Sequence, residues 1–250
     1  RIDDVTPKIV VAASCSFQGR TVVPAQATLD EALAGAVHVP DGCVIVQREA
    51  CPMRMVAGRD HDFHVLERYP PVAPVPVRAE DPLYILHTSG TTGTPKGIVR
   101  DNGGHAVALS LSMDLIYGCG AGDCFFTTSD LGWVVGHSYG VYAPLLGGGT
   151  SVIVEGCPSA SVIGQLCVAY DVKCLFTTPT QLRLMRQGGA DFSGRALPAL
   201  KRVFVAGEYA DPTLLDWARG CFERPVVNHW WQTETGWSIT AHFFGLPEAE

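Results

Sequence analysis

The sequence predicts an α/β fold of mostly parallel sheets with helices on both faces. Two observations support this prediction: short apolar runs rich in Val, Ile and Phe alternate with longer amphipathic stretches, and the connections between them are short. Strands of a parallel sheet are buried on both faces, so they read as continuous apolar runs. The 250 residues are 47% hydrophobic, which is typical of a folded protein with a sizeable core.

Eight apolar runs are the predicted strands. They are residues 9–13, 43–46, 83–87, 124–128, 151–154, 174–177, 202–206 and 226–230. Six stretches with helical periodicity lie between them: 29–36, 104–117, 138–146, 160–170, 179–187 and 212–222. The last helix is the best defined, because Asp211 is suited to cap it and Pro212 fits its first turn. The proline-rich stretch 68–81 predicts a connector and a possible subdomain boundary.

Composition excludes some classes of function. A net charge of −7 argues against nucleic acid as the main partner, because neutralising phosphates takes clustered Lys and Arg. The nine cysteines form no C-x-x-C pair, and their odd number indicates reduced, buried thiols. We therefore expect a cytoplasmic protein, or one of the mitochondrial matrix if the source is eukaryotic. His61 and His64 lie close together, but no further ligand completes a metal site, so we interpret them as a solvated loop pair.

Residues 131–154 carry no formal charge and are numerous enough to cross a membrane. Pro144 and the glycine triplet 147–149 would break a lipid-facing helix, whereas a helix, turn and strand in an α/β core need such a break. We therefore predict no membrane span. The chain starts with Arg1 and shows no leader segment, so we expect an internal piece of a longer protein.

A polar segment follows the predicted strand 83–87. It comprises Thr88, Ser89, Gly90, Thr91, Thr92, Gly93, Thr94, Pro95, Lys96 and Gly97. Glycines let the backbone turn its amides toward an anion, hydroxyls add donors, and Lys96 supplies the positive charge that suits a polyphosphate. The spacing is not that of a P-loop, since Gly97 stands where Ser or Thr would coordinate magnesium, and it is not that of a kinase glycine loop. The plain alternative is a polar turn that binds nothing.

This segment resembles the phosphate-binding motif of the adenylate-forming (AMP-binding) family, which includes acyl-CoA synthetases, peptide-synthetase adenylation domains and luciferases. Three more strings resemble the acetyl/propionyl-CoA synthetase branch: VRDNGGH (99–105), WVVGHSY (133–139) and HWWQTET (229–235). The first is most similar to propionyl-CoA synthetases. The resemblance covers nearly all of the chain and implies part of the large N-terminal domain of that fold.

The resemblance also implies an activity. In this family a carboxylic acid attacks the α-phosphate of ATP to give acyl-AMP and pyrophosphate, and CoA then displaces AMP. The expected enzyme is an acid–thiol ligase that uses ATP, Mg²⁺ and CoA, with propionate as the expected acid. Its partners would be these small molecules, with no nucleic acid and no membrane.

Site residues follow from the same resemblance. The catalytic set would be Lys96 on the β- and γ-phosphates, Thr233 on the α-phosphate and Glu234 as the Mg²⁺ ligand. ATP and AMP would be bound by Thr88, Ser89, Gly90, Thr91, Thr92, Gly93, Thr94, Lys96, Gly207, Glu208, Asn228, His229, Trp230, Gln232 and Thr233. The acyl pocket would be lined by Trp133, Val134, Val135, Ala206, Gly207 and Trp231, and Arg20 would contact CoA.

Two residues depart from the family pattern, since Asn228 stands where relatives usually carry Asp and Tyr209 replaces the usual Pro or Arg. The plain alternatives are that Trp133, Trp230 and Trp231 are core aromatics and that Glu234 is a surface carboxylate. In relatives, the aspartate that binds ribose and the small C-terminal domain with the catalytic lysine lie beyond the position that corresponds to Glu250. We therefore expect residues 1–250 alone to form no thioester.

Two other functions remain as alternatives. The first is a truncated or degenerate relative that binds nucleotide without catalysis. The second is an unrelated P-loop phosphotransferase, which the spacing of residues 88–97 disfavours.

Overall fold

The computed structural model describes residues 1–19, 21–89, 93, 95–194 and 197–246. The chain divides into two compact units, one of Arg1–Pro76 with Ser89–Gly97 and one of Val77–Thr88 with Ile98–Glu250. The division after Pro76 lies inside the proline-rich stretch 68–81. Each unit has a parallel sheet and a core of its own.

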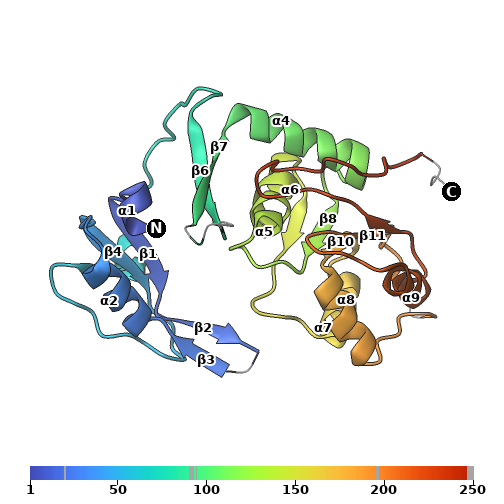
Figure 1. Cartoon of the computed structure of the whole chain (residues 1–250), viewed down its shortest axis with the longest axis horizontal. Coiled ribbons are helices and arrows are strands. Elements are labelled where there is room, and N and C mark those ends of the chain that lie inside the picture. The colour runs from blue at the N-terminus through green and yellow to red at the C-terminus, as the bar shows by residue number, and fades with distance from the viewer. Residues whose placement is uncertain (20, 90–92, 94, 195–196, 247–250) are drawn as a thin grey trace. The chain divides into compact units, whose positions relative to one another are not determined.

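The first unit is built on a small parallel sheet of the order β1-β4-β5 (Figure 1). Its strands are β1 (Ile9–Ala13), β4 (Gly42–Val46) and β5 (Asp60–Asp62). Helix α2 (Gln26–Gly35) contributes Leu29 to a core that also contains Cys43, Ile45 and Met53. The other elements of this unit are α1 (Ile2–Val5), the hairpin of β2 (Cys15–Gln18) and β3 (Thr21–Pro24), and α3 (Phe63–Leu66).

The sequence did not predict β5, because its three residues are Asp, His and Asp rather than an apolar run. Asp60 is held instead by the Arg59 guanidinium, whose Nε lies 2.6 Å from its carboxylate. This strand also corrects the interpretation of the histidine pair as a loop. His61 lies in β5 and His64 in α3, although both are exposed as expected.

The second unit contains a five-stranded parallel sheet of the order β12-β11-β10-β8-β9. Its strands are β8 (Cys124–Thr127), β9 (Thr150–Val152), β10 (Val172–Thr177), β11 (Arg202–Val205) and β12 (Val226–Asn228). The chain leaves β8 toward β9 and returns on the other side of β8 to form β10, so the strand order reverses there. Open parallel sheets usually bind ligands outside the carboxyl ends of their strands, near such a reversal.

Helices cover both faces of this sheet, which confirms the predicted fold class. One face packs against α7 (Ala160–Ala169), α8 (Pro179–Gln187) and α9 (Pro212–Phe222). The other packs against α4 (Gly103–Ser112), α5 (Val134–His137) and α6 (Ala143–Leu146), together with the π-helical turns η1 (Met113–Tyr117) and η2 (Ser138–Tyr142). Consecutive strand residues alternate between the two cores, as Phe125 and Phe126 do in β8.

Helix α9 has the predicted bounds, with Asp211 accepting a hydrogen bond from the Leu214 amide at 3.0 Å. The expected helix 104–117 is divided in two: α4 ends at Ser112, and the π-helical turn η1 follows it. The expected helix 138–146 starts earlier, at Val134, and contains η2. The predicted strand 83–87 is β6 (Pro82–Thr88), and it pairs with β7 (Lys96–Asp101), which the sequence did not predict. The polar segment after β6 therefore leads into a strand before it reaches α4.

No helix in the described part of the chain has the length and apolar character to cross a membrane. Residues 131–154 form short helical segments and β9, as the break at the glycine triplet predicted. All nine cysteines are free thiols, but Cys157 is exposed and Cys51 is half-buried, so the expectation that all are buried was wrong for these two. Among the described residues, no group of three or more His, Cys, Asp or Glu side chains is arranged to hold a metal ion.

Candidate active site

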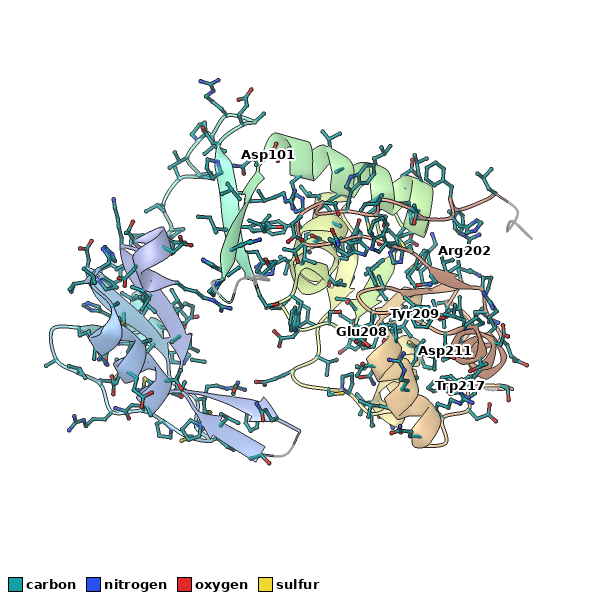
Figure 2. All side chains as sticks on the ribbon, viewed as in Figure 1. Asp101, Arg202, Glu208, Tyr209, Asp211 and Trp217 are labelled. Carbon is teal, nitrogen blue, oxygen red and sulfur yellow. The ribbon has the colours of Figure 1, made fainter. Side chains whose placement is uncertain are left out.

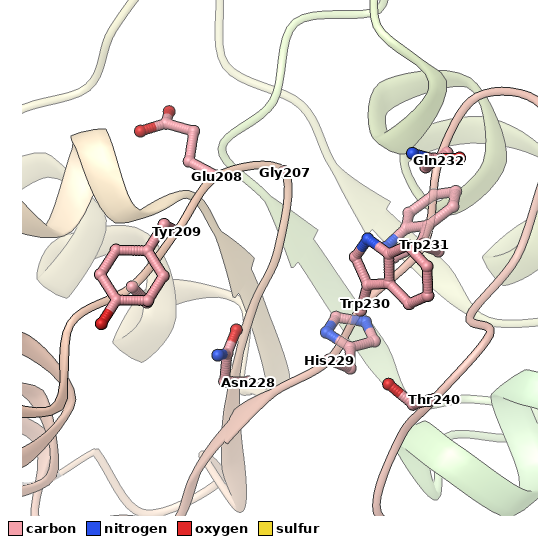
Figure 3. Close-up of a pocket in the computed structure, with 10 residues that line it drawn as sticks. Gly207, Glu208, Tyr209, Asn228, His229, Trp230, Trp231, Gln232 and Thr240 are labelled. Atoms are coloured by element: carbon pink, nitrogen blue, oxygen red, sulfur yellow. The ribbon is translucent and has the colours of Figure 1, made fainter.

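A pocket of about 470 Å³ lies at the carboxyl ends of β11 and β12 (Figure 3). The loops that leave these two strands line it with Gly207, Glu208, Tyr209, Ala210, Asn228, His229, Trp230, Trp231 and Gln232, and Thr240 completes the wall. The carboxyl edge of an open parallel sheet is the usual place for a ligand in such folds. The structure therefore brings together six predicted nucleotide-binding positions from two separate loops: Gly207, Glu208, Asn228, His229, Trp230 and Gln232.

The loop after β11 is fixed by helix α8. Gly207 has φ +97°, in the left-handed region that favours glycine. The carboxylate of Glu208 accepts hydrogen bonds from Thr180 Oγ1 at 2.7 Å and from Arg183 Nη1 at 3.2 Å, and Arg183 Nη2 donates to the Tyr209 carbonyl at 2.9 Å. Figure 2 shows Glu208 and Tyr209 beside this helix. The Glu208 carboxylate is thus engaged within the protein, while the Tyr209 ring is 78% exposed.

His229 forms part of the buried support of the pocket. Its Nδ1 lies 2.9 Å from the Val205 carbonyl, which only accepts, so Nδ1 carries the proton and donates. Its Nε2 therefore accepts from the Tyr117 hydroxyl, 2.9 Å away. Burial lowers the pKa of His229 to about 4, so the ring is neutral at pH 7. Both ring nitrogens are occupied inside the protein, and neither is free to bind a nucleotide.

Trp231 is buried beside this pocket, in the core that faces α4, α5 and η2. Its indole lies edge-to-face on Tyr139, with ring centroids 5.5 Å apart and planes at 90°. Val135 and Ala206 belong to the same cluster, and Val134 packs against it. Four of the six predicted acyl-pocket residues are therefore gathered in one apolar region, with Gly207 next in the chain, whereas Trp133 is 71% exposed.

Arg100 holds the turn that carries Thr233 and Glu234, a role that sequence reasoning missed. Its Nη2 donates to the Thr233 carbonyl at 2.6 Å and to the Glu234 carbonyl at 3.3 Å. Gly236 has φ +77°, in the left-handed region that favours glycine, and a Cβ there would lie 2.6 Å from the guanidinium and displace it. The signal in the sequence was weak, because an arginine in VRDNGGH has no visible partner until the chain folds.

Glu234 is exposed on this turn, and no hydrogen bond or ion pair occupies its carboxylate within the described part of the chain. A free carboxylate oxygen is the kind of ligand that Mg²⁺ prefers, so the residue fits the predicted metal role. Thr233 is half-buried on the same turn. The turn itself is closed by Thr235, whose Oγ1 accepts from the Gln232 amide at 3.1 Å. The single proton of this hydroxyl faces two carbonyls, Gln232 at 3.0 Å and Trp237 at 2.9 Å.

The predicted phosphate-binding segment is described only in part. Thr88 ends β6 and is half-buried, Ser89 and Lys96 are exposed, and Gly93 has φ +84°. Gly90, Thr91, Thr92 and Thr94 lie outside the described residues, as does Arg20, the predicted CoA contact. The left-handed backbone at Gly93 agrees with a loop that turns its amides toward an anion.

Comparison with known proteins places the chain in a family. The model of the AMP-binding enzyme family matches residues 1–250. The chain is 45% identical over 257 residues to human acyl-CoA synthetase short-chain family member 3, mitochondrial, covering 98% of the chain and 37% of that protein. It is 41% identical over 255 residues to propionate–CoA ligase of Escherichia coli, covering 99% of the chain and 41% of the ligase.

A third relative, an uncharacterized protein of Pseudomonas aeruginosa, is 44% identical over 254 residues and covers 98% of the chain. The chain spans about two fifths of the length of these relatives, at 37%, 40% and 41%. The family match extends over every element that positions the pocket. This chain therefore belongs to the AMP-binding enzyme family.

Proposed function

We propose that the protein activates a short-chain carboxylic acid, with propionate as the preferred acid, by forming acyl-AMP from ATP and then passing the acyl group to CoA. Family membership and the names of relatives support the reaction class. The observation that carries the proposal is an apolar cluster that adjoins the pocket at the carboxyl ends of β11 and β12, because Trp231 belongs to the cluster and also lines the pocket. A small acid and a nucleotide then lie side by side.

Charge and alignment do most of the work in this reaction, because two negatively charged reactants have to meet. Lys96 neutralises the developing pyrophosphate, and Thr233 donates from its hydroxyl to the α-phosphate. Glu234 would hold Mg²⁺, which when bound would offset the repulsion between the acid and the phosphates. Arg100 keeps the backbone of residues 233–235 in place for these roles through its hydrogen bonds to three successive carbonyls.

The nucleotide base occupies the pocket between the two loops. Asn228, exposed at the end of β12, presents an amide oxygen that is able to accept from the adenine amino group. Trp230 is 55% exposed and offers a ring face for stacking. His229 helps to shape the pocket but does not bind the base through a ring nitrogen, since its imidazole is hydrogen-bonded to Val205 and Tyr117.

The deciding experiment is acid-dependent exchange between ATP and pyrophosphate in the full-length protein, with straight-chain acids of increasing length. We expect exchange to depend on a short acid and to be greatest with propionate. The alternative is a degenerate relative that binds ATP without reacting. It predicts nucleotide binding by calorimetry with no exchange for any acid, and that outcome would replace the proposal.

A further inference from the structure

Two π-helical turns pack on the same face of the parallel sheet, and each delivers one buried tyrosine. Turn η1 ends at Tyr117 and η2 contains Tyr139, and these side chains are 1% and 0% exposed. π-Helical turns are rare in proteins, and those that occur often lie at functional sites. The two rings touch, with centroids 4.7 Å apart. Their hydroxyl groups also interact with each other. The hydrogen bond that each hydroxyl makes outside the pair nevertheless leads to a different residue, His229 for Tyr117 and Ser112 for Tyr139.

Tyr117 supports His229. Its hydroxyl donates to His229 Nε2 at 2.9 Å, and the other nitrogen of that ring donates to Val205. The Tyr117 ring packs against Phe204 at 4.5 Å and Phe125 at 5.3 Å, so its position is fixed by the sheet beneath it. This contact holds the start of the 229–231 segment, where the chain leaves β12 and enters the nucleotide pocket.

Tyr139 supports Trp231, two residues further along the same segment. Ser112 Oγ donates its one proton to the Leu109 carbonyl at 2.9 Å, so it accepts from the Tyr139 hydroxyl at 2.8 Å. Ser112 is the last residue of α4 and is fully buried. This hydrogen bond anchors the hydroxyl end of Tyr139, while packing on Tyr117, Phe125 and Phe176 holds the plane of the ring. The Trp231 indole lies edge-to-face on that ring.

We propose that Tyr139, anchored by Ser112, is a positioning residue that sets how far the Trp231 indole closes on the acid, while Tyr117 positions the nucleotide wall through His229. This inference rests on the proposed function. It follows from the outer partners of the two hydroxyls: Tyr117 is anchored on His229 and Tyr139 on Ser112, each in a buried position where losing the hydrogen bond is costly. Each ring also contacts a different residue of one segment, His229 for Tyr117 and Trp231 for Tyr139.

The test uses Tyr139→Phe and Tyr117→Phe in the full-length protein, a matched pair in which each variant loses one hydroxyl from the same core. For each, kcat and KM are measured in ATP–pyrophosphate exchange with acids of two to six carbons and with varied ATP. We expect Tyr139→Phe to change the ratio of kcat/KM between short and longer acids by about fivefold, with KM for ATP unchanged. Tyr117→Phe should raise KM for ATP by about fivefold and leave the acid profile as in wild type.

Ser112 provides an independent variant on another element. Ser112→Ala removes the acceptor of the Tyr139 hydroxyl and should reproduce the change in acid profile, whereas Ser112→Thr keeps the hydroxyl and should restore it. If Tyr139→Phe does not fold, the Ser112 pair decides the question alone.

Parallel changes in both tyrosine variants, or an unchanged acid profile in Tyr139→Phe or Ser112→Ala, would overturn the inference. A wild-type protein without acid-dependent exchange would instead overturn the proposed function. The two failures are therefore distinguishable.

Discussion

The two faces of the five-stranded sheet differ in what they bury. The face under α7, α8 and α9 has a core whose buried members include no Tyr or Trp among the described residues, and it consists mainly of Val, Leu, Cys and Phe. The opposite face buries Tyr117, Tyr139 and Trp231, and His229 packs against the same aromatic cluster. The first face is close-packed apolar surface. The second adds hydrogen bonds made by buried aromatic side chains, which contribute to orientation as well as stability.

On the proposed function, the two faces of this sheet have different roles, one in stability and the other in the selection of the acid. Apolar packing tolerates a change of shape better than a hydrogen-bonded aromatic cluster does, because an unpaired buried hydroxyl carries its full desolvation penalty. We call the face under α7, α8 and α9 the aliphatic face and the opposite face the aromatic face. Variants on the aliphatic face should therefore change stability without changing the preferred acid. Variants on the aromatic face, or on the turns that leave it, should change the reaction.

The largest effect is expected for the charged residues proposed to act on pyrophosphate. Glu234 and Lys96 are exposed, so replacing either by Ala should leave the melting temperature near that of wild type. Each loss of a charge-stabilising contact should lower the exchange rate by about 10²- to 10³-fold. Glu31→Ala, at an exposed glutamate of α2, is the matched control and should keep full activity. Exchange close to wild type in both Glu234→Ala and Lys96→Ala would show that other residues carry the charge.

The aliphatic face is tested by two leucines of one helix. Leu182 of α8 is 0% exposed, whereas Leu184 on the same helix is 48% exposed. Leu182→Ala should lower the free energy of unfolding by about 2–5 kcal/mol, and Leu184→Ala should change it by less than about 1 kcal/mol. Denaturant titration measures both. If Leu182→Ala also shifts the preference among acids, the two faces do not have separate roles.

Much of the fold could be predicted from the sequence, because strands and amphipathic helices leave strong periodic patterns. Helices α8 and α9 have the predicted bounds, since Pro at the first turn and a capping Thr178 or Asp211 mark their starts. Strand β7 and the hairpin of β2 and β3 were missed. Their partners are near in the sequence, but β2 and β3 are only four residues each, and β7 carries charged residues at both ends, so none of them forms a clear apolar run.

The candidate site was predictable as a set of motifs but not as a set of contacts. The sequence singled out His229 and Trp231 in HWWQTET, yet nothing in it shows that Tyr117 and Tyr139 support them. Tyr117 and His229 are 112 residues apart, and long-range pairing has no periodic signal. The orientation of Glu208 toward α8, through Thr180 and Arg183, was equally invisible for the same reason.

Acidification should weaken the aromatic face through His229, whose pKa burial lowers from 6.5 to about 4. In the unfolded chain this histidine takes up a proton below about pH 6.5, whereas in the folded protein it stays neutral until about pH 4. The contribution of neutral His229 to the free energy of unfolding is therefore complete above pH 6.5 and is lost as the pH falls from 6.5 to 4. The loss amounts to on the order of 3 kcal/mol.

His229→Asn removes this titration, so its stability should fall less steeply between pH 6.5 and 4 than that of wild type. His64 is the control, because it is exposed and Glu67 raises its pKa, which gives the opposite sign. His64→Asn should lose stability between pH 6.5 and 4 as steeply as wild type does. Urea unfolding at half-unit pH steps measures all three proteins, and equal slopes for wild type and His229→Asn would show that the histidine is not held neutral.

The smallest effect, and the finest test of the aromatic face, is the length of the acid. Trp231 is buried over the apolar cluster, and Ala206 is 1% exposed within it, at the position where the resemblance places a valine in acetate enzymes. Valine there would remove space for about one or two carbons. Burial of a methylene contributes about 0.8 kcal/mol, which alone is about fourfold, and enzyme pockets discriminate a methylene by about 10- to 200-fold. We therefore expect propionate to be preferred to acetate by about tenfold.

Ala206→Val should therefore move the preference back toward acetate, and Trp231→Gly should admit acids beyond about five carbons by removing the indole that overlaps them. Trp133→Gly is the matched control, because that indole is 71% exposed and should bound the chain length far less. The measurement is kcat/KM for acids of two to eight carbons in the full-length protein. A profile that shifts with Trp133→Gly and not with Trp231→Gly would place the limit at the exposed ring. Acid selectivity would then lie outside the aromatic face, and buried hydrogen bonds would have to be explained by stability alone.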